Sequence, residues 1–416
     1  MKVKLSFLLL VSFLMQSCMT KEILEFEELV SWKKGGVCVL KRGNFYPVKT
    51  INIPSDLQIS GRRTKIYFDD KSPFPVFRAF QTKNTVISKL DFVGKPLQKI
   101  SNKSTLDGYN YKFIFEIHNS SALVIDMCRF VNSYGTTVHL SDCREVKFKN
   151  SAFRNIGLST SGDGMYSYDG IIIGAYNRSE KITISGCDFS NIGTNFPQGV
   201  PNWPNDGDGI HIQGKGEISD VSILSNRFYR CASRGIKVQS GSNISIQKNH
   251  FEDCWTAVNM AMAKDIHGAD ISNNILKNCR LSFGTDCLAD EKRTAYGVKI
   301  SQNSVDNCLH FFRTSGQSSV SDALISGNSI DSIGTYFFTG RMLNARIENN
   351  TVLRYATAND PTDNMAIYIS PESDRLIVQN NVFGKSPFSK KEIVNQSKNE
   401  VNIGDNQFLP YKIDKK

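Results

Sequence analysis

Short segments in which β-branched residues alternate with polar ones recur along most of the chain. Ile182–Ile184, Val221–Ile223 and Ile244–Ile246 are typical, and Gly, Asn and Ser interrupt the pattern on either side of them. Alternation over a few residues places one set of side chains on each face of a strand, whereas a helix needs a longer pattern with a period of about 3.6 residues. The pattern therefore predicts many short strands and argues against a helical repeat.

One phrase returns along the chain: an Asn, an apolar residue two positions later, and a Cys five positions after the Asn. Copies begin at Asn226, Asn249, Asn274 and Asn303, with weaker ones at Asn328, Asn350 and Asn381. Upstream, the Asn position is held by Cys128, Ser151 and Cys187, each two residues before Phe130, Phe153 and Phe189. From Asn226 onward the copies are 22 to 31 residues apart. Such a period is typical of stacked units that bury a face only against their neighbours.

These repeats predict an all-β fold, a single-stranded right-handed parallel β-helix (a solenoid) with end caps and loop insertions. Each coil would hold two or three short strands and stack about 4.8 Å from the next. We expect the recurrent Asn side chains to form a ladder at one corner, with Phe and Cys facing inward. Parallel side chains suit a disulfide poorly, so the Cys column is expected to consist of buried thiols. Its members are Cys231, Cys254, Cys279 and Cys308.

The chain resembles the pectate-lyase-like β-helix superfamily from about residue 35 to residue 405. The segments Gly35–Tyr46 and Ile51–Gly61 are similar to the opening of those proteins. The resemblance implies the fold, but one fold hosts many functions, so activity must be argued from a site. We expect residues 1–17 to be a signal peptide, 18–34 an N-terminal cap or linker that includes a short helix, 35–405 the β-helix, and 406–416 a C-terminal tail.

A second register lies one strand away from the Asn phrase. Its segments are Thr136–Leu140, Asp169–Ile173, Asp208–Ile212, Arg234–Val238 and Thr256–Met260. Strand alternation predicts an inward column of Val138, Ile171, Ile210, Ile236 and Val258. The outward column is then His139, Ile172, His211, Lys237 and Asn259, and the corner column is Thr136, Asp169, Asp208, Arg234 and Thr256. We expect Gly170, Gly209 and Gly235 to keep the surface low enough for a ligand to approach the backbone.

Charged residues gather on the middle three of these coils, within about 10 Å if the register holds. Candidate catalytic residues are Asp169, Asp206, Asp208, His211, Arg234 and Lys237. We expect their side chains to face solvent in a groove. Two loop segments, 158–168 and 194–207, flank them, and loops on a rigid scaffold are a usual place for function. Candidate substrate-binding residues are Trp203, Tyr166, Tyr168, Asn259 and His139.

Paired carboxylates favour glycoside hydrolysis. Asp206 and Asp208 lie close enough in sequence for one to keep its proton as general acid, while Asp169 activates water. Arg234 and Lys237 would bind the carboxylate of an acidic polysaccharide. The arrangement resembles the polygalacturonase family, with Asp169-Gly170 and Asp206-Gly-Asp208 at its first two motifs. Ser233-Arg234-Gly235 stands where that family has Gly-His-Gly.

Two alternatives remain open. A polysaccharide lyase would use Lys237 or Arg234 as the base for β-elimination, and Asp169, Asp206 and Asp208 would then be able to hold Ca²⁺. The hydrolase needs no cofactor. A non-catalytic protein would bind or display polysaccharide, with Trp203, Tyr166 and Tyr168 stacking on sugars.

Composition and the N-terminus indicate where the protein works. With 40% hydrophobic and 22% charged residues the chain is globular, and its net charge of +10 suits a polyanionic partner. Lys2 and Lys4 precede an apolar run that ends before Ser17-Cys18, which resembles a bacterial lipoprotein signal with Cys18 lipidated. We expect an exported lipoprotein, at the outer membrane or cell surface or in the periplasm, held to the membrane by its lipid alone. No dense basic run with interleaved aromatics indicates nucleic-acid binding.

Overall fold

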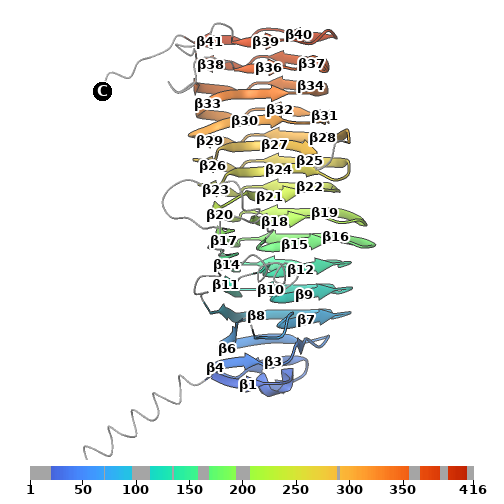
Figure 1. Cartoon of the computed structure of the whole chain (residues 1–416), viewed down its shortest axis with the longest axis vertical. Coiled ribbons are helices and arrows are strands. Elements are labelled where there is room, and N and C mark those ends of the chain that lie inside the picture. Colours follow the sequence, from blue (N-terminus) through green and yellow to red (C-terminus); the bar gives the residue numbers. More distant parts are fainter. Residues whose placement is uncertain are drawn as a thin grey trace, which may run out of the picture.

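Successive coils of the chain stack along one axis in the computed structural model, from β1 at one end to β41 at the other (Figure 1). The structure describes residues 20–69, 71–95, 113–133, 135–157, 168–193, 207–287, 291–355, 366–384 and 392–409. No helix among these residues is long and apolar enough to span a membrane. The stacked strands confirm the predicted all-β fold, a parallel β-helix.

Three rows of parallel strands run along the axis, and in each row a strand pairs with the strand one coil away. Row A contains β5 (Ile51–Asn52), β7 (Phe77–Phe80), β9 (Phe115–His118), β12 (Val138–Ser141), β15 (Ile171–Gly174), β18 (Asp208–Ile212), β21 (Arg234–Val238), β24 (Thr256–Met262), β27 (Leu281–Cys287), β30 (Cys308–Thr314), the second half of β33 (Ser329–Gly340), β36 (Ile367–Ile369) and β39 (Ile393–Asn395).

Row B contains β3 (Val37–Leu40), β6 (Gln58–Phe68), β8 (Lys83–Gly94), β10 (Ser121–Asp126), β13 (Lys147–Lys149), β16 (Arg178–Ser185), β19 (Glu217–Leu224), β22 (Gly241–Gln247), β25 (Ile266–Ser272), β28 (Arg293–Ser301), β31 (Ser318–Ser321), β32 (Leu324–Ser326), β34 (Met342–Glu348), β37 (Asp374–Gln379) and β40 (Val401–Ile403). Row C contains β1 (Thr20–Ile23), β4 (Gly43–Pro47), β11 (Arg129–Ser133), β14 (Ala152–Ile156), β17 (Asp188–Ile192), β20 (Arg227–Cys231), β23 (His250–Glu252), β26 (Ile275–Lys277), β29 (Ser304–Asp306), β35 (Thr351–Tyr355), β38 (Val382–Gly384) and β41 (Gln407–Leu409), together with parts of β6, β8 and β33.

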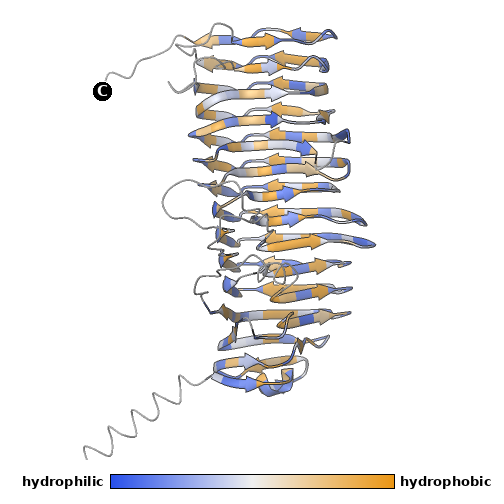
Figure 2. Cartoon of the chain, viewed as in Figure 1, coloured by the Kyte–Doolittle hydropathy of each residue, from blue (hydrophilic) through white to orange (hydrophobic). Residues whose placement is uncertain are grey.

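Hydrophobic and hydrophilic residues alternate along many of the strands (Figure 2), and the hydrophobic core consists of buried residues inside the coils. One stack of Phe rings runs parallel to the axis, with neighbouring ring centroids 4.8–5.0 Å apart. Its members are Phe92, Phe130, Phe153, Phe189, Phe228 and Phe251. This spacing is the distance between paired strands, so each Phe packs on the same residue of the next coil. The prediction that the repeated Phe faces inward is confirmed.

The predicted Asn ladder forms at the corner between rows B and C. Asn226 donates from Nδ2 to Oδ1 of Asn249 at 3.1 Å, and Asn249 donates in the same way to Asn274. Equivalent bonds continue through Asn303, Asn328, Asn350, Asn381 and Asn406. Each amide also donates to a backbone carbonyl one coil back, as Asn249 does to Ile223 at 2.9 Å. The ladder therefore satisfies backbone groups that the turn leaves without a strand partner.

The Cys column is buried, and the described cysteines are free thiols, which confirms the prediction for Cys231, Cys254, Cys279 and Cys308. Cysteines of the earlier coils are also buried. Burial raises the pKa of the Cys128 and Cys187 thiols to about 12 each. They therefore act as small apolar side chains.

Both ends of the β-helix differ from the bounds predicted from the sequence. The helix expected within residues 21–34 is confined to α2 (Phe26–Leu29), because strand pairing takes its flanks. Thr20–Ile23 pairs with β4, and β2 (Val30–Lys34) pairs antiparallel with β3. Pairing of exposed strand edges competes well with so short a helix. At the other end, β41 pairs with β38, so the sheet continues past residue 405.

Candidate active site

The predicted columns of row A are confirmed by the strand register. His139 lies beside Ile172, Ile172 beside His211, His211 beside Lys237, and Lys237 beside Asn259. At the corner, Asp208 lies beside Arg234 and Arg234 beside Thr256. The inward residues Ile171, Ile210 and Ile236 are 0% exposed and fill the interior. The polar residues of three successive coils are therefore brought together on the outer side of row A.

The three corner glycines have a different role from the one expected. A Cβ on Gly209 would lie 2.6 Å from the carbonyl oxygen of Gly235 and 2.7 Å from the ring of Phe228. Gly170 and Gly235 likewise face a ring of the Phe stack. They are needed for close packing of the corner against the core, and the expectation that they open the backbone to a ligand is wrong.

Asp169 accepts two hydrogen bonds that fix the geometry of the site. The backbone N–H of Asp208 donates to Oδ1 of Asp169 at 3.0 Å. Nδ1 of His211 lies 3.1 Å from Oδ2 of the same carboxylate, which assigns the proton of the ring to Nδ1. Nε2 of His211 is then a bare acceptor, buried and without a hydrogen-bond partner among the described residues. Asp169 and His211 form a carboxylate–imidazole dyad.

The second carboxylate of the site lies between two cations. Oδ1 of Asp208 is 3.6 Å from Nη1 of Arg234, and Oδ2 is 3.8 Å from Nζ of Lys237. Arg234 also donates from Nη1 to the Ser233 hydroxyl at 3.0 Å. Their approach agrees with the predicted clustering of opposite charges on the coils that begin at 208 and 234.

The expectation that these side chains face solvent is wrong. Asp169 and Asp208 are 0% exposed, His211 and Lys237 3%, and Arg234 7%. Buried charges are tolerated when opposite charges and hydrogen bonds compensate them, and here two carboxylates, two cations and an imidazole meet. The site is therefore a buried polar cluster, and Arg234 is its most exposed member.

A divalent cation fits the described residues poorly. One atom each from Asp169, Asp208 and His211 lie within 4.8 Å of one another, which is a possible ligand set. However, Arg234 and Lys237 are already beside Asp208, and their positive charges would oppose a further cation. Ca²⁺ also prefers six to eight oxygen ligands, and two carboxylates with an imidazole do not supply them.

The remaining predicted residues make other contacts or lie outside the described residues. Tyr168 is buried against Gly157, so its ring does not offer a face to a sugar. Asn259 donates from Nδ2 to Asp286 at 3.1 Å. His139 is half-buried, and burial lowers its pKa. Asp206, Tyr166, Trp203 and the lipidation candidate Cys18 lie outside the described residues.

Sequence reasoning missed three neighbours of the predicted residues. Phe113 stacks on His139 with ring centroids 4.5 Å apart, Ser233 accepts from Arg234, and Asp286 accepts from Asn259. Only Ser233 could have been found from the sequence, because it directly precedes Arg234. The other two come from different coils, and no repeat marks them.

A family model described as "Right handed beta helix region" matches residues 167–319. No curated protein matches the sequence. Among solved structures, the catalytic unit of the GH87 α-1,3-glucanase from Streptomyces thermodiastaticus aligns over 92% of this chain and 66% of that chain, with 12% identity and a TM-score of 0.57.

Two further structures align with lower scores. The adhesin PfbA of Streptococcus pneumoniae is 15% identical over 91% of this chain and 84% of that chain, with a TM-score of 0.48. An exopolygalacturonase from Thermotoga maritima is 10% identical over 92% and 86%, also with a TM-score of 0.48. At these identities the likeness shows the fold alone. The chain is a right-handed parallel β-helix.

Proposed function

We propose that the protein is an exported enzyme that cleaves an acidic polysaccharide by β-elimination, with His211 as the base. The observation that supports this best is the dyad: Asp169 holds Nδ1 of His211, and the neighbouring coil supplies Lys237 and Arg234. A base beside paired cations is what elimination next to a uronate carboxylate requires.

The steps follow from these positions. Arg234 and Lys237 bind the carboxylate of a uronate, which neutralises charge that builds up as the adjacent proton leaves. Nε2 of His211 takes that proton, and Asp169 stabilises the resulting imidazolium. The electron pair of the broken C–H bond forms a C=C bond as the glycosidic C–O bond breaks. The leaving oxygen then takes a proton from the imidazolium or from water. We assign the base to His211 because its Nε2 is a bare acceptor, whereas Arg234 and Lys237 are cations.

Hydrolysis is the second candidate, and one observation favours it. Carboxylate oxygens of Asp169 and Asp208 lie within 4.8 Å of each other. Separations of about 5–5.5 Å are typical of retaining glycosidases, so a hydrolase with this pair would retain the anomeric configuration. Against it, Asp208 lies between two cations, an environment that stabilises a carboxylate in its ionised form and suits a general acid poorly.

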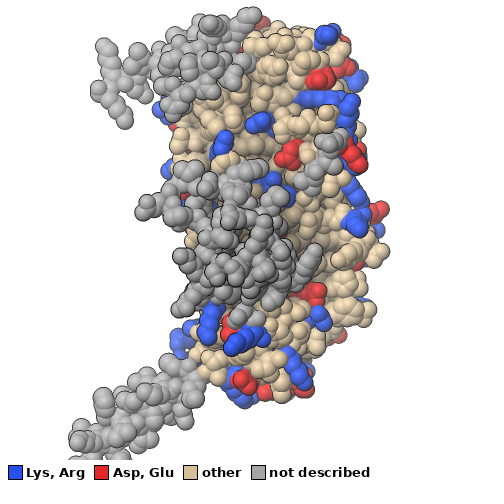
Figure 3. All heavy atoms as spheres, viewed as in Figure 1, with Lys and Arg blue, Asp and Glu red and all other residues tan. Residues whose placement is uncertain are grey.

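Other features support the substrate class and the location. The α-1,3-glucanase that shares the fold acts on a polysaccharide. The net charge of +10 suits a polyanion, although Lys and Arg are interspersed with Asp and Glu over the face seen in Figure 3. The argument for an acidic substrate therefore depends on the buried cations of the site. We retain export with Cys18 as the lipid attachment site as part of this proposal.

One assay separates the candidates. The purified protein is incubated with polygalacturonate, alginate, hyaluronan and chondroitin, with and without chelator. Elimination produces an unsaturated uronate that absorbs in the near ultraviolet, whereas hydrolysis produces reducing ends without that absorbance. We expect the absorbance to appear, to be unaffected by the chelator, and to be lost in His211→Asn.

The contrary outcomes are distinct. Reducing ends without absorbance would replace elimination with hydrolysis. Loss of activity on chelation would restore the Ca²⁺ version of the site. Binding of a glycan without either product would favour the non-catalytic role.

A further inference from the structure

A cavity of about 350 Å³ opens on the coils that follow the candidate active site. Trp255, Arg280, Leu309 and Gly334 line it, one from each of four successive coils. Thr256, the residue after Trp255, lies beside Arg234 in row A. The cavity therefore begins one coil beyond Arg234, and Arg280 lies two coils beyond, a distance of about 10 Å along the axis.

Arg280 is held over an aromatic ring and makes no ion pair with the described residues. Its guanidinium carbon is 4.1 Å from the centroid of the Trp255 ring, and the side chain is exposed. Arg227 offers a contrast, because it lies 4.8 Å from the Tyr229 ring but also pairs with Glu252 at 3.5 Å. A guanidinium over the face of an indole ring is attracted to the ring, and its N–H groups suit a planar anion such as a carboxylate.

The next coil carries a second cation. Arg313 continues the outward column of row A, is exposed, and likewise forms no ion pair within the described part of the chain. His310 is close to both guanidinium groups. Burial, followed by the charges of Arg313 and Arg280, lowers the pKa of His310 to about 4. The imidazole is therefore neutral at neutral pH, and the excess charge of this region comes from the two arginines.

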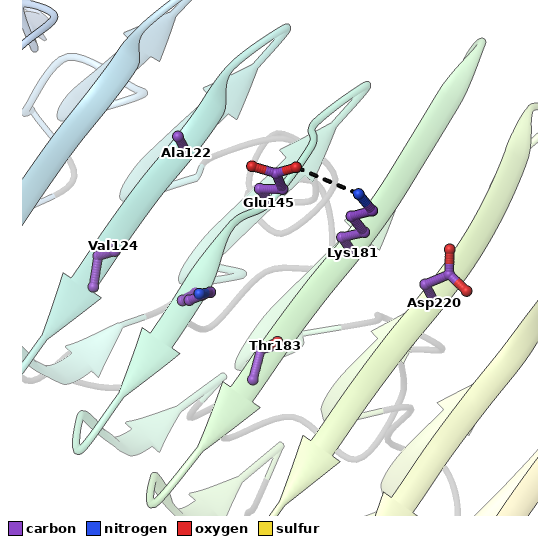
Figure 4. Close-up of a pocket in the computed structure, with 7 residues that line it drawn as sticks. Ala122, Val124, Glu145, Lys181, Thr183 and Asp220 are labelled. Atoms are coloured by element: carbon purple, nitrogen blue, oxygen red, sulfur yellow. Dashed lines mark ion pairs between the residues drawn. The ribbon is translucent and has the colours of Figure 1, made fainter.

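A different hollow, on row B, does not have an excess of positive charge. That hollow, of about 450 Å³, is lined by Glu145, Lys147, Lys181 and Asp220 with three smaller residues (Figure 4). Its acidic and basic groups offset each other, and Lys181 pairs with Glu145 at 3.5 Å. The one charged side chain that lines the Trp255 cavity is the cation Arg280, whereas two acidic and two basic side chains line the row B hollow.

We propose that Trp255 and Arg280 form a binding subsite for an acidic sugar of the polysaccharide, with Arg280 bound to its carboxylate and Arg313 on the following coil. This proposal rests on the proposed function. It says where on the protein the polysaccharide continues beyond the sugar that reacts. Successive coils are about 4.8 Å apart, which is comparable to the length of one sugar unit. A polysaccharide bound along the axis of the β-helix therefore places successive sugars on successive coils. The subsite would then hold a sugar one or two units from the one at Lys237.

Affinity for oligosaccharides of two lengths tests this. Trimers and hexamers of galacturonate, mannuronate and guluronate, and the methyl esters of the hexamers, are titrated by calorimetry into the full chain carrying His211→Asn. Arg280→Met keeps the alkyl stem over Trp255 and removes the charge, and Arg227→Met is the matched control. We expect Arg280→Met to weaken binding of the preferred acidic hexamer about tenfold or more, as for a charged hydrogen bond. The trimer, the methyl ester and the Arg227→Met protein should show no such loss.

The outcomes separate this subsite from the proposed function. If the hexamer binds Arg280→Met as tightly as the parent while His211→Asn abolishes cleavage, the subsite is overturned and the function stands. Equal losses for trimer and hexamer would also overturn it, since the residue would then act at the reacting sugar. If no acidic hexamer binds and no glycan is cleaved, both proposals fail.

Discussion

Asp169 is the residue on which the proposed chemistry depends most. By accepting from Nδ1 of His211, it leaves Nε2 as the free nitrogen and fixes the plane of the ring. The same carboxylate accepts from the backbone of Asp208, so the coil that begins at 169 positions both polar residues of the next coil. Its place in the corner column indicated proximity, but not this orienting role.

Asp169→Asn should therefore reduce catalysis without removing the substrate-binding residues. An amide can donate to the ring and favour the tautomer with its proton on Nε2, so kcat is expected to fall about 10²- to 10⁴-fold with little change in KM. His211→Asn should cause a similar loss, and the double variant little more. Asp220→Asn, on row B, is the control, and melting temperatures are measured beside the rates. Losses that multiply in the double variant would show that the two residues act independently.

His310 provides a pH dependence with a defined sign. Its imidazole is stacked on Tyr336 and lies 2.6 Å from the Thr335 hydroxyl. Burial is the main reason that its pKa falls from 6.5 to about 4. Between these values the unfolded chain binds a proton that the folded chain does not, so stability should decrease as the pH falls from 6.5 toward 4.

The expected loss across this window is about 3 kcal/mol, with no further loss from this residue below it. Urea unfolding at several pH values measures it, and His310→Gln should flatten that part of the profile. If the variant and the parent lose stability equally between pH 6.5 and 4, the protonation of another group is responsible.

The Asn ladder is the element that most clearly follows from the sequence. Asn274 accepts at Oδ1 from the backbone and side chain of Asn249, and donates to Asn303 and to the carbonyl of Ile246. All of these groups are buried. Removing a single amide therefore leaves several polar groups of two neighbouring coils without partners.

Asn274→Ala should accordingly lower the free energy of unfolding by about 3 kcal/mol or more. Asn52→Ala is the matched control, because Asn52 is exposed on β5, and it should change stability by less than about 0.5 kcal/mol. Chemical denaturation of both variants provides the comparison. Equal effects would mean that the ladder contributes no more than a surface amide.

Repetition explains which elements were predictable. The Asn, Phe and Cys positions recur on coil after coil, and a residue that repeats with the coil must lie above its own copy. The row A register from His139 to Asn259 follows in the same way. The packing of Gly209 against Phe228 could not be predicted from repetition. Strand alternation breaks at a corner, where Gly209 and Ile210 both face inward.

The burial of the site was not predictable for a related reason. A column shows which residues are neighbours along the axis, but not what covers them. The repeats also did not single out Trp255 and Arg280, although each directly follows a Cys of the repeated phrase. They differ from each other in residue type, and a search for repeats discards positions that vary. In a solenoid, ligands are bound by residues that differ from coil to coil and lie beside the positions that repeat.

At the scale of the whole molecule, the stack of coils makes stability depend on position. A central coil is covered on both sides, whereas the last coil has one neighbour. Ile244, Ile246 and Met260 in the centre are 1% exposed, but Ile403 and Leu409 on the last strands are 43% and 42% exposed. The strand edges of β39, β40 and β41 also have no following strand to pair with among the described residues.

Amide hydrogen exchange should therefore be graded along the axis. We expect β40 and β41 to exchange fastest, because opening them breaks one interface, and β22 to β26 to exchange slowest, because they open only when both neighbours are lost. Exchange measured by mass spectrometry on peptides from each coil tests this. Asn274→Ala should accelerate exchange mainly in the coils of β22 to β29 and leave β3 to β8 unchanged. A uniform increase along the whole chain would instead show that the coils unfold as one cooperative unit, and nearest-neighbour packing would then not describe this protein.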